Sequence, residues 1–383
     1  MKVLFTQHSL VYRGGSELFV IETAQALQRA GHDVAVYAGA IGPVADELRS
    51  QGIPVLPDPR LCPWMPDVIH GQHRVHALKA LAAFPRTPAI LHVHGFIPVL
   101  EKPFIHPRIL RYVVISPGSV EFWSRDLGVE RGRFQILLNG IDLFRFASVR
   151  QPPDLPRSAL LYSNSSPQAR ELSEIDQACA ERGVRLQKAG LCTGQQEKHP
   201  EHLLPQFDLV FASGRSALES AASGCAVIPL SGHMAEELLT ASNYQRLRGQ
   251  NMAPSFFSHH QVSKEWIGRQ IDAWDAGKVA AVTTKVREDC AGRNQVGELE
   301  TLYGQVVAEF HDQPLVDLEV EFEAIASVMV VDASTRVTEL QERLRSMAGH
   351  WSWRLRHPLR LIHQALRAVN AALRGLKSKT KAS

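Results

Sequence analysis

Long apolar runs are absent from this sequence, and no stretch approaches the roughly 20 apolar residues that cross a bilayer. The first residues, MKVLFTQHSLVYRGGSE, contain only a three-residue apolar run before Thr6 and Gln7, which is too short for the core of a signal peptide. We therefore expect a cytoplasmic chain that neither spans a membrane nor carries a classical secretion signal.

Cysteine is scarce as well. The five cysteines are odd in number and scattered, and no two of them form a C-x-x-C pair (Cys62, Cys179, Cys192, Cys225 and Cys290). This spacing argues against a zinc ribbon or a dithiol redox centre and favours a reducing compartment.

Histidine is frequent, yet its spacing does not indicate a metal centre. His92 and His94 are two apart on an expected strand, so that both side chains would point to one face of a sheet, and His70 and His73 form a second pair. Neither pair has a Cys, an Asp or a third His at ligand spacing. We expect no bound metal ion.

The composition is that of a globular protein with a charged end. Of the 383 residues, 45% are apolar and 21% are charged, which excludes disordered and collagen-like chains. This length exceeds what one hydrophobic core usually serves, so we expect two domains and a tail. From Arg343 onward there are ten Lys and Arg and no Asp or Glu, so the net charge of +3 leaves the preceding residues at −7. Such an asymmetry suggests a basic tail that meets an anionic surface.

Strand and helix patterns alternate through residues 1–150. KVLFT reads as a buried parallel strand, and GGSELFVIETAQALQRAG has the spacing of a helix with Gly31 at its C′ position. DVIHG, AILHVHG and RYVVIS are further apolar strands that end in small or polar residues. An open parallel sheet with helices on both faces is predicted.

Three prolines in VRQPPDLPRS, residues 149–158, predict a linker, and a second alternation follows over residues 158–310. ALLYSNSS, VRLQKAG, FDLVFASG and CAVIPL are the expected strands, and ELSEIDQACAERG is an expected helix closed by Gly183.

Residues 315–383 are predicted to form a helical tail. Between Leu359 and Leu376, apolar residues recur at spacings of three and four beside arginines, which predicts a basic amphipathic helix. Trp351 and Trp353 precede it, and tryptophan prefers the membrane–water interface. The same seam also fits a coiled coil, so the tail contacts either a membrane or a protein surface.

Two loops stand where an open α/β sheet binds ligands, because helix N-termini there favour anions. Gly14 and Gly15 would let the backbone approach a phosphate, although Gly-Gly is as often a simple turn. In SGRSALESAASGCAVIPL, Arg215, Ser216 and Glu219 lie at an expected helix start. The carboxylate of Glu219 could accept hydrogen bonds from two ribose hydroxyls, whereas Ser216 and Glu219 also spell the capping box S-x-x-E.

His94 ends an expected strand at the same edge of the first sheet. It is interpreted either as a polar group that contacts substrate or as a strand-end histidine satisfied within the protein.

In chain order, RGGSE, VHG, VVISPGS, ILLNGIDLFRF and GRSALESAASGCAVI resemble motifs of the retaining GT-B glycosyltransferases, particularly the family 4-like group that uses nucleotide-sugars. The resemblance covers about residues 1–310. The segment Asn139-Gly140-Ile141-Asp142 with Phe146 is similar to the element that closes the first domain of that family, and ALESAASGCAVI is similar to its E-A-x-A-x-G-x-P-V-I element.

The resemblance implies an α/β GT-B fold in which two Rossmann-like, doubly wound domains face each other across a cleft, with a C-terminal helical tail. Residues 1–150 would form the acceptor side, and residues 158–310 would hold the nucleotide-sugar. Carried over by motif, Glu219 would bind the ribose, Arg215 and Ser216 the nucleotide or diphosphate, and Gly14 and Gly15 the diphosphate. His94 would contact the donor sugar as the catalytic-site histidine.

The sequence departs from the family in two places. The family often has a Glu eight positions before the one matched by Glu219, and here that position is Phe211. The family also tends to have Gly-Arg and Lys-Gly after the first strand of its second domain, where this chain has Ser163 and Asn164. The hydroxyl and amide of these two residues would bind phosphate instead, and Arg215 would supply the missing positive charge.

We therefore expect a retaining, metal-independent hexosyltransferase without a cofactor. It would move a sugar from a nucleotide-sugar to a glycan or lipid-linked acceptor in surface polysaccharide synthesis. Residues 351–381 would contact the inner face of a membrane peripherally, and no nucleic-acid partner is expected. The departures leave open a noncatalytic GT-B-like scaffold of a glycan assembly complex. A nucleotide-sugar epimerase shares the fold, but would require paired acid–base carboxylates, of which the sequence has no convincing set.

Overall fold

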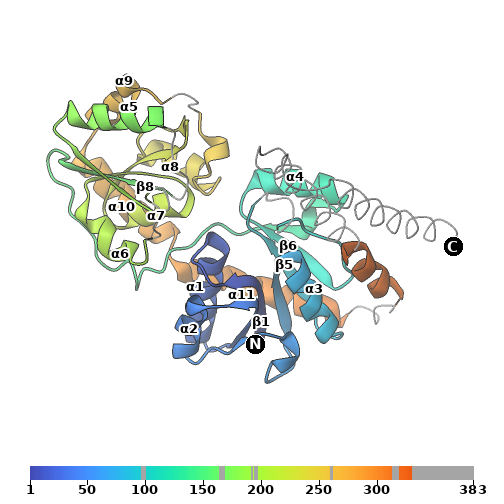
Figure 1. Ribbon diagram of the computed structural model, residues 1–383. Helices are drawn as coiled ribbons and strands as arrows, with labels where there is room; N and C mark the ends of the chain where they lie inside the picture. Colours follow the sequence, from blue (N-terminus) through green and yellow to red (C-terminus); the bar gives the residue numbers. More distant parts are fainter. Residues whose placement is uncertain are drawn as a thin grey trace, which may run out of the picture. The chain divides into compact units, whose positions relative to one another are not determined.

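The computed structural model describes residues 1–95, 101–163, 169–190, 193, 197–258, 262–312 and 319–329 (Figure 1). The chain divides into two compact units, Met1–Ile325 and Ala326–Ser383. Of the predicted tail, residues 319–329 are described and helical, whereas the amphipathic segment 351–381 lies outside the described residues. Among the described residues, none of the helices has both the length and the hydropathy of a membrane span.

The first sheet is entirely parallel and has its earliest strand near the middle. Its strand order is β3-β2-β1-β4-β5-β6-β7. In that order the strands are Val55–Leu56, Asp33–Ile41, Lys2–Leu10, Val68–Gln72, Ala89–Val93, Ile109–Val114 and Phe134–Ile136. Phe5 of β1 pairs with His70 of β4, which in turn pairs with Ile90 of β5. The carboxyl ends of β1, β4 and β5 therefore lie side by side.

The helices of this domain follow the predicted alternation. They are α1 (Gly15–Arg29), α2 (Pro43–Ser50), α3 (Arg74–Ala83) and α4 (Pro117–Leu127), with short 3-10 turns at Pro59–Leu61 and Arg131–Arg133. In α1 the buried residues Val20, Ala24 and Leu27 share one helix face. The helix ends at Arg29 with Ala30 as its C-cap residue, and Gly31 follows with a φ of 91°. The predicted C′ glycine is confirmed, because this conformation suits a residue without Cβ.

The second sheet has the order β12-β11-β10-β8-β9, and only β12 is antiparallel to its neighbour. In that order the strands are Met234–Ala235, Ala226–Ser231, Leu209–Ala212, Ser158–Tyr162 and Arg185–Ala189. Its α-helices are α5 (Ala169–Ala180), α6 (Pro200–Leu203), α7 (Gly214–Ala222), α8 (Ala241–Arg248), α9 (Lys264–Asp272) and α10 (Ala276–Asp289). Two more 3-10 turns lie at Leu204–Gln206 and Pro254–Phe256.

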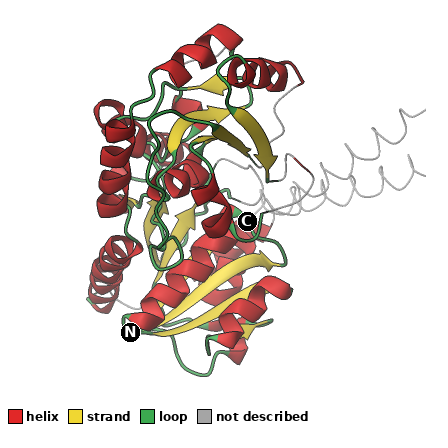
Figure 2. Cartoon of the chain, turned by 90° about the vertical axis from the view of Figure 1, so that its left-hand side faces the viewer, coloured by secondary structure: helices red, strands yellow, loops and turns green. Residues whose placement is uncertain are grey.

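Helices cover both faces of this second sheet, as Figure 2 shows for the yellow strands among red helices. Val210 and Leu160 pack on one face in a core shared with α7, α8 and α10. Leu209 and Phe211 pack on the other face in a core shared with α5 and α9. Because successive strand residues point to opposite faces, both faces must be apolar, which is the pattern of a doubly wound sheet.

The last long helix returns to the first sheet. Ile141 forms a parallel bridge with Ala291, and α11 (Gly292–His311) begins directly after it. The side chains of Leu299, Tyr303 and Val306 lie in the core of the first sheet, where α11 contacts α1 (Figure 1). Most of this helix falls within the 158–310 range predicted for the second domain, yet its apolar face contributes to the core of the first.

Candidate functional site

A small pocket within the Met1–Ile325 unit gathers most of the residues expected to bind a nucleotide-sugar. Its volume is about 90 Å³. It is lined by Arg13, Gly14, Gly15, Leu18, Arg145, Tyr162, Glu197, Pro200, Arg215, Ser216 and Glu219. Of the predicted residues, Gly14, Gly15, Arg215, Ser216 and Glu219 are therefore brought together. Ser163 follows Tyr162 at the end of β8 but is not part of this lining, and Asn164 lies outside the described residues.

Glu219 does not form the capping box that S-x-x-E suggested. Helix α7 begins at Gly214 after the N-cap residue Ser213, three positions earlier than the capping box requires, and Ser213 makes no side-chain cap hydrogen bond. Gly214 has a φ of 57°, and its N–H donates to the carbonyl of Met252 at 2.7 Å. This turn sets the helix start, so Ser216 lies inside the first turn. The side chain of Glu219 is free to bond Arg215 instead.

Arg215 links two carboxylates. Its Nε donates to Oε1 of Glu219 at 2.7 Å, and its terminal nitrogen donates to Oε2 of Glu22 on α1. Burial raises the pKa of Glu219, and the guanidinium of Arg215 only partly opposes that effect. Burial acts to lower the pKa of Arg215, but the carboxylates of Glu22 and Glu219 outweigh it and raise the pKa above its ordinary value. The pocket thus holds a permanently charged guanidinium beside a desolvated carboxylate.

The guanidiniums of Arg13 and Arg145 line the pocket together with that of Arg215, and the sequence predicted no role for Arg145. Arg145 follows the turn at Asp142, whose Oδ1 accepts a hydrogen bond from the N–H of Phe144 at 2.9 Å. Its Nε donates to Oε2 of Glu201 at 2.8 Å, and its Nη1 lies 3.6 Å from Oε1 of Glu22. The residue stands within the motif ILLNGIDLFRF, but only the fold brings it beside Arg215.

His94 lies at the carboxyl end of the first sheet, directly after β5. Its Nε2 is 2.7 Å from Oε1 of Gln72, and its ring stacks on His92 with the centroids 4.1 Å apart. The prediction that His92 and His94 share one face is confirmed. Burial and the neighbouring His92 hold the pKa of His94 well below its ordinary value, so the ring is neutral at physiological pH.

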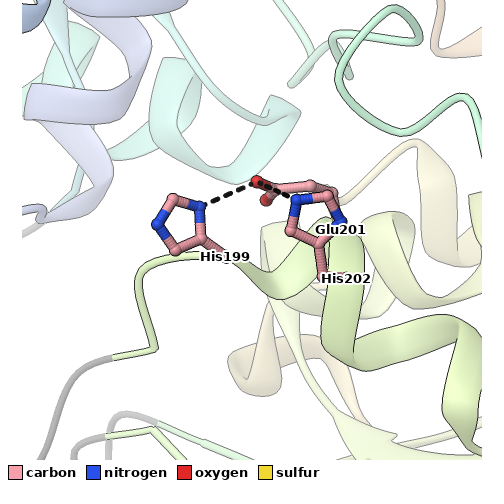
Figure 3. A group of neighbouring side chains, drawn as sticks. All are labelled: His199, Glu201 and His202. Carbon is pink, nitrogen blue, oxygen red and sulfur yellow. Dashed lines mark hydrogen bonds and ion pairs between the residues drawn. The ribbon is translucent and has the colours of Figure 1, made fainter.

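One group of side chains in the described part of the chain has the spacing of metal ligands. It consists of His199, Glu201 and His202, and Figure 3 shows both imidazoles turned towards the carboxylate of Glu201. Oε1 of Glu201 is 3.1 Å from Nδ1 of His199 and 4.0 Å from Nε2 of His202, while Oε2 binds Arg145. Both histidines are largely exposed, and a cation here would lie beside a guanidinium. Metal independence stays a prediction.

The chain is similar to known glycosyltransferases, in sequence over its first part and in fold over most of its length. Residues 13–145 match the Glycosyltransferase Family 4 profile, which covers about a third of the chain. No curated protein matches the chain. A glycosyltransferase structure from Rickettsia africae is 14% identical, with a TM-score of 0.59 over 80% of this chain and 98% of that one. HepE from Anabaena bound to UDP is 15% identical, with a TM-score of 0.56 over 80% of this chain and 100% of that one. The structure of HepE with UDP and glucose is 16% identical, with a TM-score of 0.53 over 80% of this chain and 100% of that one.

The chain has the GT-B fold. The resemblance to family 4-like GT-B glycosyltransferases that its motifs predicted is confirmed.

The departures from the GT-B family pattern have structural counterparts. Phe211 is completely buried between the second sheet and helices α5 and α9, so the position expected to carry a second carboxylate does not line the pocket. Strand β8 exits at Tyr162 without a cation, but Arg145 and Arg215 both line the pocket beside Tyr162. Positive charge is therefore present there, although it comes from other segments of the chain.

Proposed function

We propose that the chain is a glycosyltransferase that moves a hexosyl unit from a nucleotide-sugar to a glycan or lipid-linked acceptor. One observation carries the proposal: the N-terminal turns of α1 and α7 meet in one pocket with three guanidiniums, those of Arg13, Arg145 and Arg215, and with the buried carboxylate of Glu219. Backbone N–H groups at helix starts and guanidiniums suit a diphosphate, and a carboxylate suits a pair of ribose hydroxyls. Together these groups match the parts of a nucleoside diphosphate.

The proposed roles follow from this pairing. Glu219 binds the ribose, while Arg215 and Ser216 bind the diphosphate from the N-terminal turn of α7. Gly14 and Gly15 approach the diphosphate at the start of α1. Because glycine has no side chain, a phosphate can come close to the backbone there. Ser163, at the end of β8, is a further phosphate contact, as is Asn164. Arg145 joins them, because it lies in the same pocket as Arg215.

The proposed chemistry rests on charge that develops on the leaving diphosphate. When the bond from the sugar to the diphosphate breaks, fixed positive groups stabilise the departing oxygen, which lowers the barrier. Glu201 holds Arg145 and Glu219 holds Arg215, so the positions of both guanidiniums are set before the donor binds. The reaction is proposed to retain the stereochemistry of the donor, to need no metal or cofactor, and to involve His94 as the group that contacts the donor sugar.

Two separate arguments narrow the choice of donor and the choice of acceptor. HepE binds UDP and glucose, and a UDP-hexose is therefore the first donor to test. The ten basic residues from Arg343 onward favour an acceptor at an anionic membrane surface, such as a lipid-linked glycan used for surface polysaccharide. Co-sedimentation with vesicles containing anionic lipid should decrease for a chain ending at Gly349, and equal sedimentation would remove the membrane part of the proposal.

The central test is a thermal-shift screen with UDP-, GDP- and TDP-sugars on the wild type and on Glu219→Ala. A ligand present at 100 times its Kd stabilises the folded state by about 2.7 kcal/mol, which corresponds to a shift of several degrees. We expect one nucleotide class to shift the wild type and to shift Glu219→Ala less. If no nucleotide-sugar stabilises the wild type, the transferase proposal fails. Stabilisation without release of the nucleotide in the presence of acceptors would favour the noncatalytic scaffold.

A further inference from the structure

Three adjacent strands of the first sheet each end at or near a histidine, and two kinds of contact, hydrogen bonds and an ion-pair contact, connect these ends. His8 lies in the last part of β1, His73 follows β4, and His94 follows β5. The side chain of Glu101 approaches both His73 and His94. The connection therefore runs across three strands at the edge where His94 is proposed to meet the donor sugar.

His73 has a backbone conformation that a side chain rarely adopts. Its φ is 57°, it is the N-cap residue of α3, and its side chain is buried. Such backbone strain is most often retained at functional sites. The Nδ1 atom of His73 accepts a hydrogen bond from the N–H of His8 at 3.1 Å, so Nε2 carries the ring proton. Nε2 is 3.5 Å from Oε1 of Glu101.

Glu101 uses its other oxygen on the backbone of His94. Oε2 of Glu101 accepts a hydrogen bond from the N–H of His94 at 2.9 Å. The carboxyl group is buried, and burial raises its pKa, but the contacts with His73 and His94 outweigh this and lower it. Glu101 is therefore a desolvated carboxylate whose two oxygens are directed at two different strand ends.

We propose that His73 and Glu101 are positioning residues, which hold the backbone of His94 at the donor sugar. The proposal rests on the proposed function, because it assumes that His94 contacts the sugar. Gln72 holds the ring of His94 from one side, while Glu101 holds its N–H group, so both the ring and the backbone are fixed. A displacement of about 1 Å in such a group can lower a rate about 100-fold.

The hydrogen bond from the N–H of His94 to Glu101 can be tested without any nucleotide. Glu101→Ala removes the acceptor of the His94 N–H, so hydrogen exchange at His94 should become at least tenfold faster. Glu121→Ala is the matched control, since Glu121 is exposed and pairs with Arg131 at the surface. Unchanged exchange at His94 in a folded Glu101→Ala protein would overturn the proposal, whatever the protein binds.

The functional part is tested with UDP and UDP-glucose on the full chain. Glu101→Gln keeps the shape of the side chain but presents an amide to one of its two partners, and His73→Asn suits the positive φ but shortens the link. We expect the rate of UDP release from UDP-glucose to fall 10- to 100-fold in both variants, with the Kd for UDP within twofold of the wild type. The Glu121→Gln control should match the wild type.

The outcomes separate the two proposals. Wild-type turnover in Glu101→Gln would overturn the positioning role. An equal loss of UDP binding and turnover, together with a lower Tm, would show that Glu101 only maintains the fold, and would also overturn it. If the wild type itself binds neither UDP nor UDP-glucose, the proposed function with this donor fails. Hydrogen exchange at the N–H of His94 then decides whether His73 and Glu101 hold the backbone of His94.

Discussion

Arg215 and Glu219 lie one turn apart on α7 and bond each other across 2.7 Å, where the sequence alone suggested a helix cap. If Glu219 binds ribose, its removal should weaken nucleoside and nucleotide binding alike. We expect Glu219→Gln to raise the Kd for both uridine and UDP about 10- to 100-fold, the value of a hydrogen bond to a charged group. Titration calorimetry measures both. Glu288→Gln, at an exposed position near the end of α10, is the control, and equal affinities in the two variants would contradict the ribose role.

Substitution of Arg145 or Arg215 should affect the binding of a nucleoside and of a nucleoside diphosphate differently. Because Arg145 and Arg215 are proposed to contact phosphate, replacing either with Gln should weaken UDP about tenfold or more and leave uridine nearly unchanged. The comparison uses the same calorimetric titrations, with the exposed Arg131→Gln as control. A variant that loses uridine and UDP to the same extent would place that arginine at the nucleoside or in the fold instead.

The carboxylate of Glu22 contacts Arg145 and Arg215, the two arginines that are proposed to bind the diphosphate. Its Oε2 accepts from Arg215 and its Oε1 lies 3.6 Å from Nη1 of Arg145, and the pocket volume of about 90 Å³ is below the 300 Å³ or more of typical ligand sites. A donor must therefore displace Glu22 from the guanidiniums. We expect Glu22→Gln to bind UDP roughly three- to tenfold more tightly, equivalent to about 0.7–1.4 kcal/mol. Asp46→Asn, exposed on α2, is the control, and weaker binding would assign Glu22 to the site itself.

The fold was predictable because it depends on local patterns. Short apolar strands alternating with helical spacing gave both sheets, and Gly31 marked the end of α1 as expected. The return of α11 to the first sheet was not predictable in this way. Its apolar face fits either domain by periodicity, and in the structure the helix follows the bridge between Ile141 and Ala291 and packs into the core of the first sheet.

The candidate site was predictable where motifs carry glycine or a lone carboxylate, as at Gly14, Gly15 and Glu219. The sequence did not predict a role for Arg145, Glu22 or Glu101, because no motif marks their positions. Each becomes relevant only through partners far along the chain. The capping-box interpretation failed for a related reason. S-x-x-E describes four residues, whereas the start of α7 is set by Gly214 and its hydrogen bond to Met252.

A buried ion pair fixes the helical segment that follows α11. Arg108 is fully buried and donates to the carbonyls of Leu81, Phe84 and Thr87, and its guanidinium also binds the carboxylate of Glu321. Removing one partner leaves an uncompensated buried charge, so Glu321→Ala should lower the free energy of unfolding by about 3–5 kcal/mol. Urea denaturation measures it, with Glu309→Ala, partly exposed on α11, as the control. A loss below 1 kcal/mol would mean that the carbonyls alone satisfy Arg108.

The buried histidines of the first sheet should make the fold sensitive to mild acid. Nε2 of His70 lies 3.2 Å from Nδ1 of His92, and Nδ1 of His70 lies 2.6 Å from the hydroxyl of Tyr303. Burial holds the pKa of both histidines well below the ordinary 6.5. Between those lowered values and 6.5 the unfolded chain binds protons that the folded chain excludes. Stability is therefore fully present above pH 6.5 and is lost as the pH falls.

Each of these histidines should contribute up to about 1.4 kcal/mol of lost stability per pH unit below 6.5. His92→Gln removes one titrating group while an amide still faces His70, so the slope of unfolding free energy against pH should decrease by one group's share. Urea denaturation from pH 5 to 7.5 measures the slope for the wild type, His92→Gln and the control His202→Gln, whose ring is largely exposed. Identical slopes in all three proteins would mean that the interior at His92 admits a proton, contrary to its burial between Phe19 and His70.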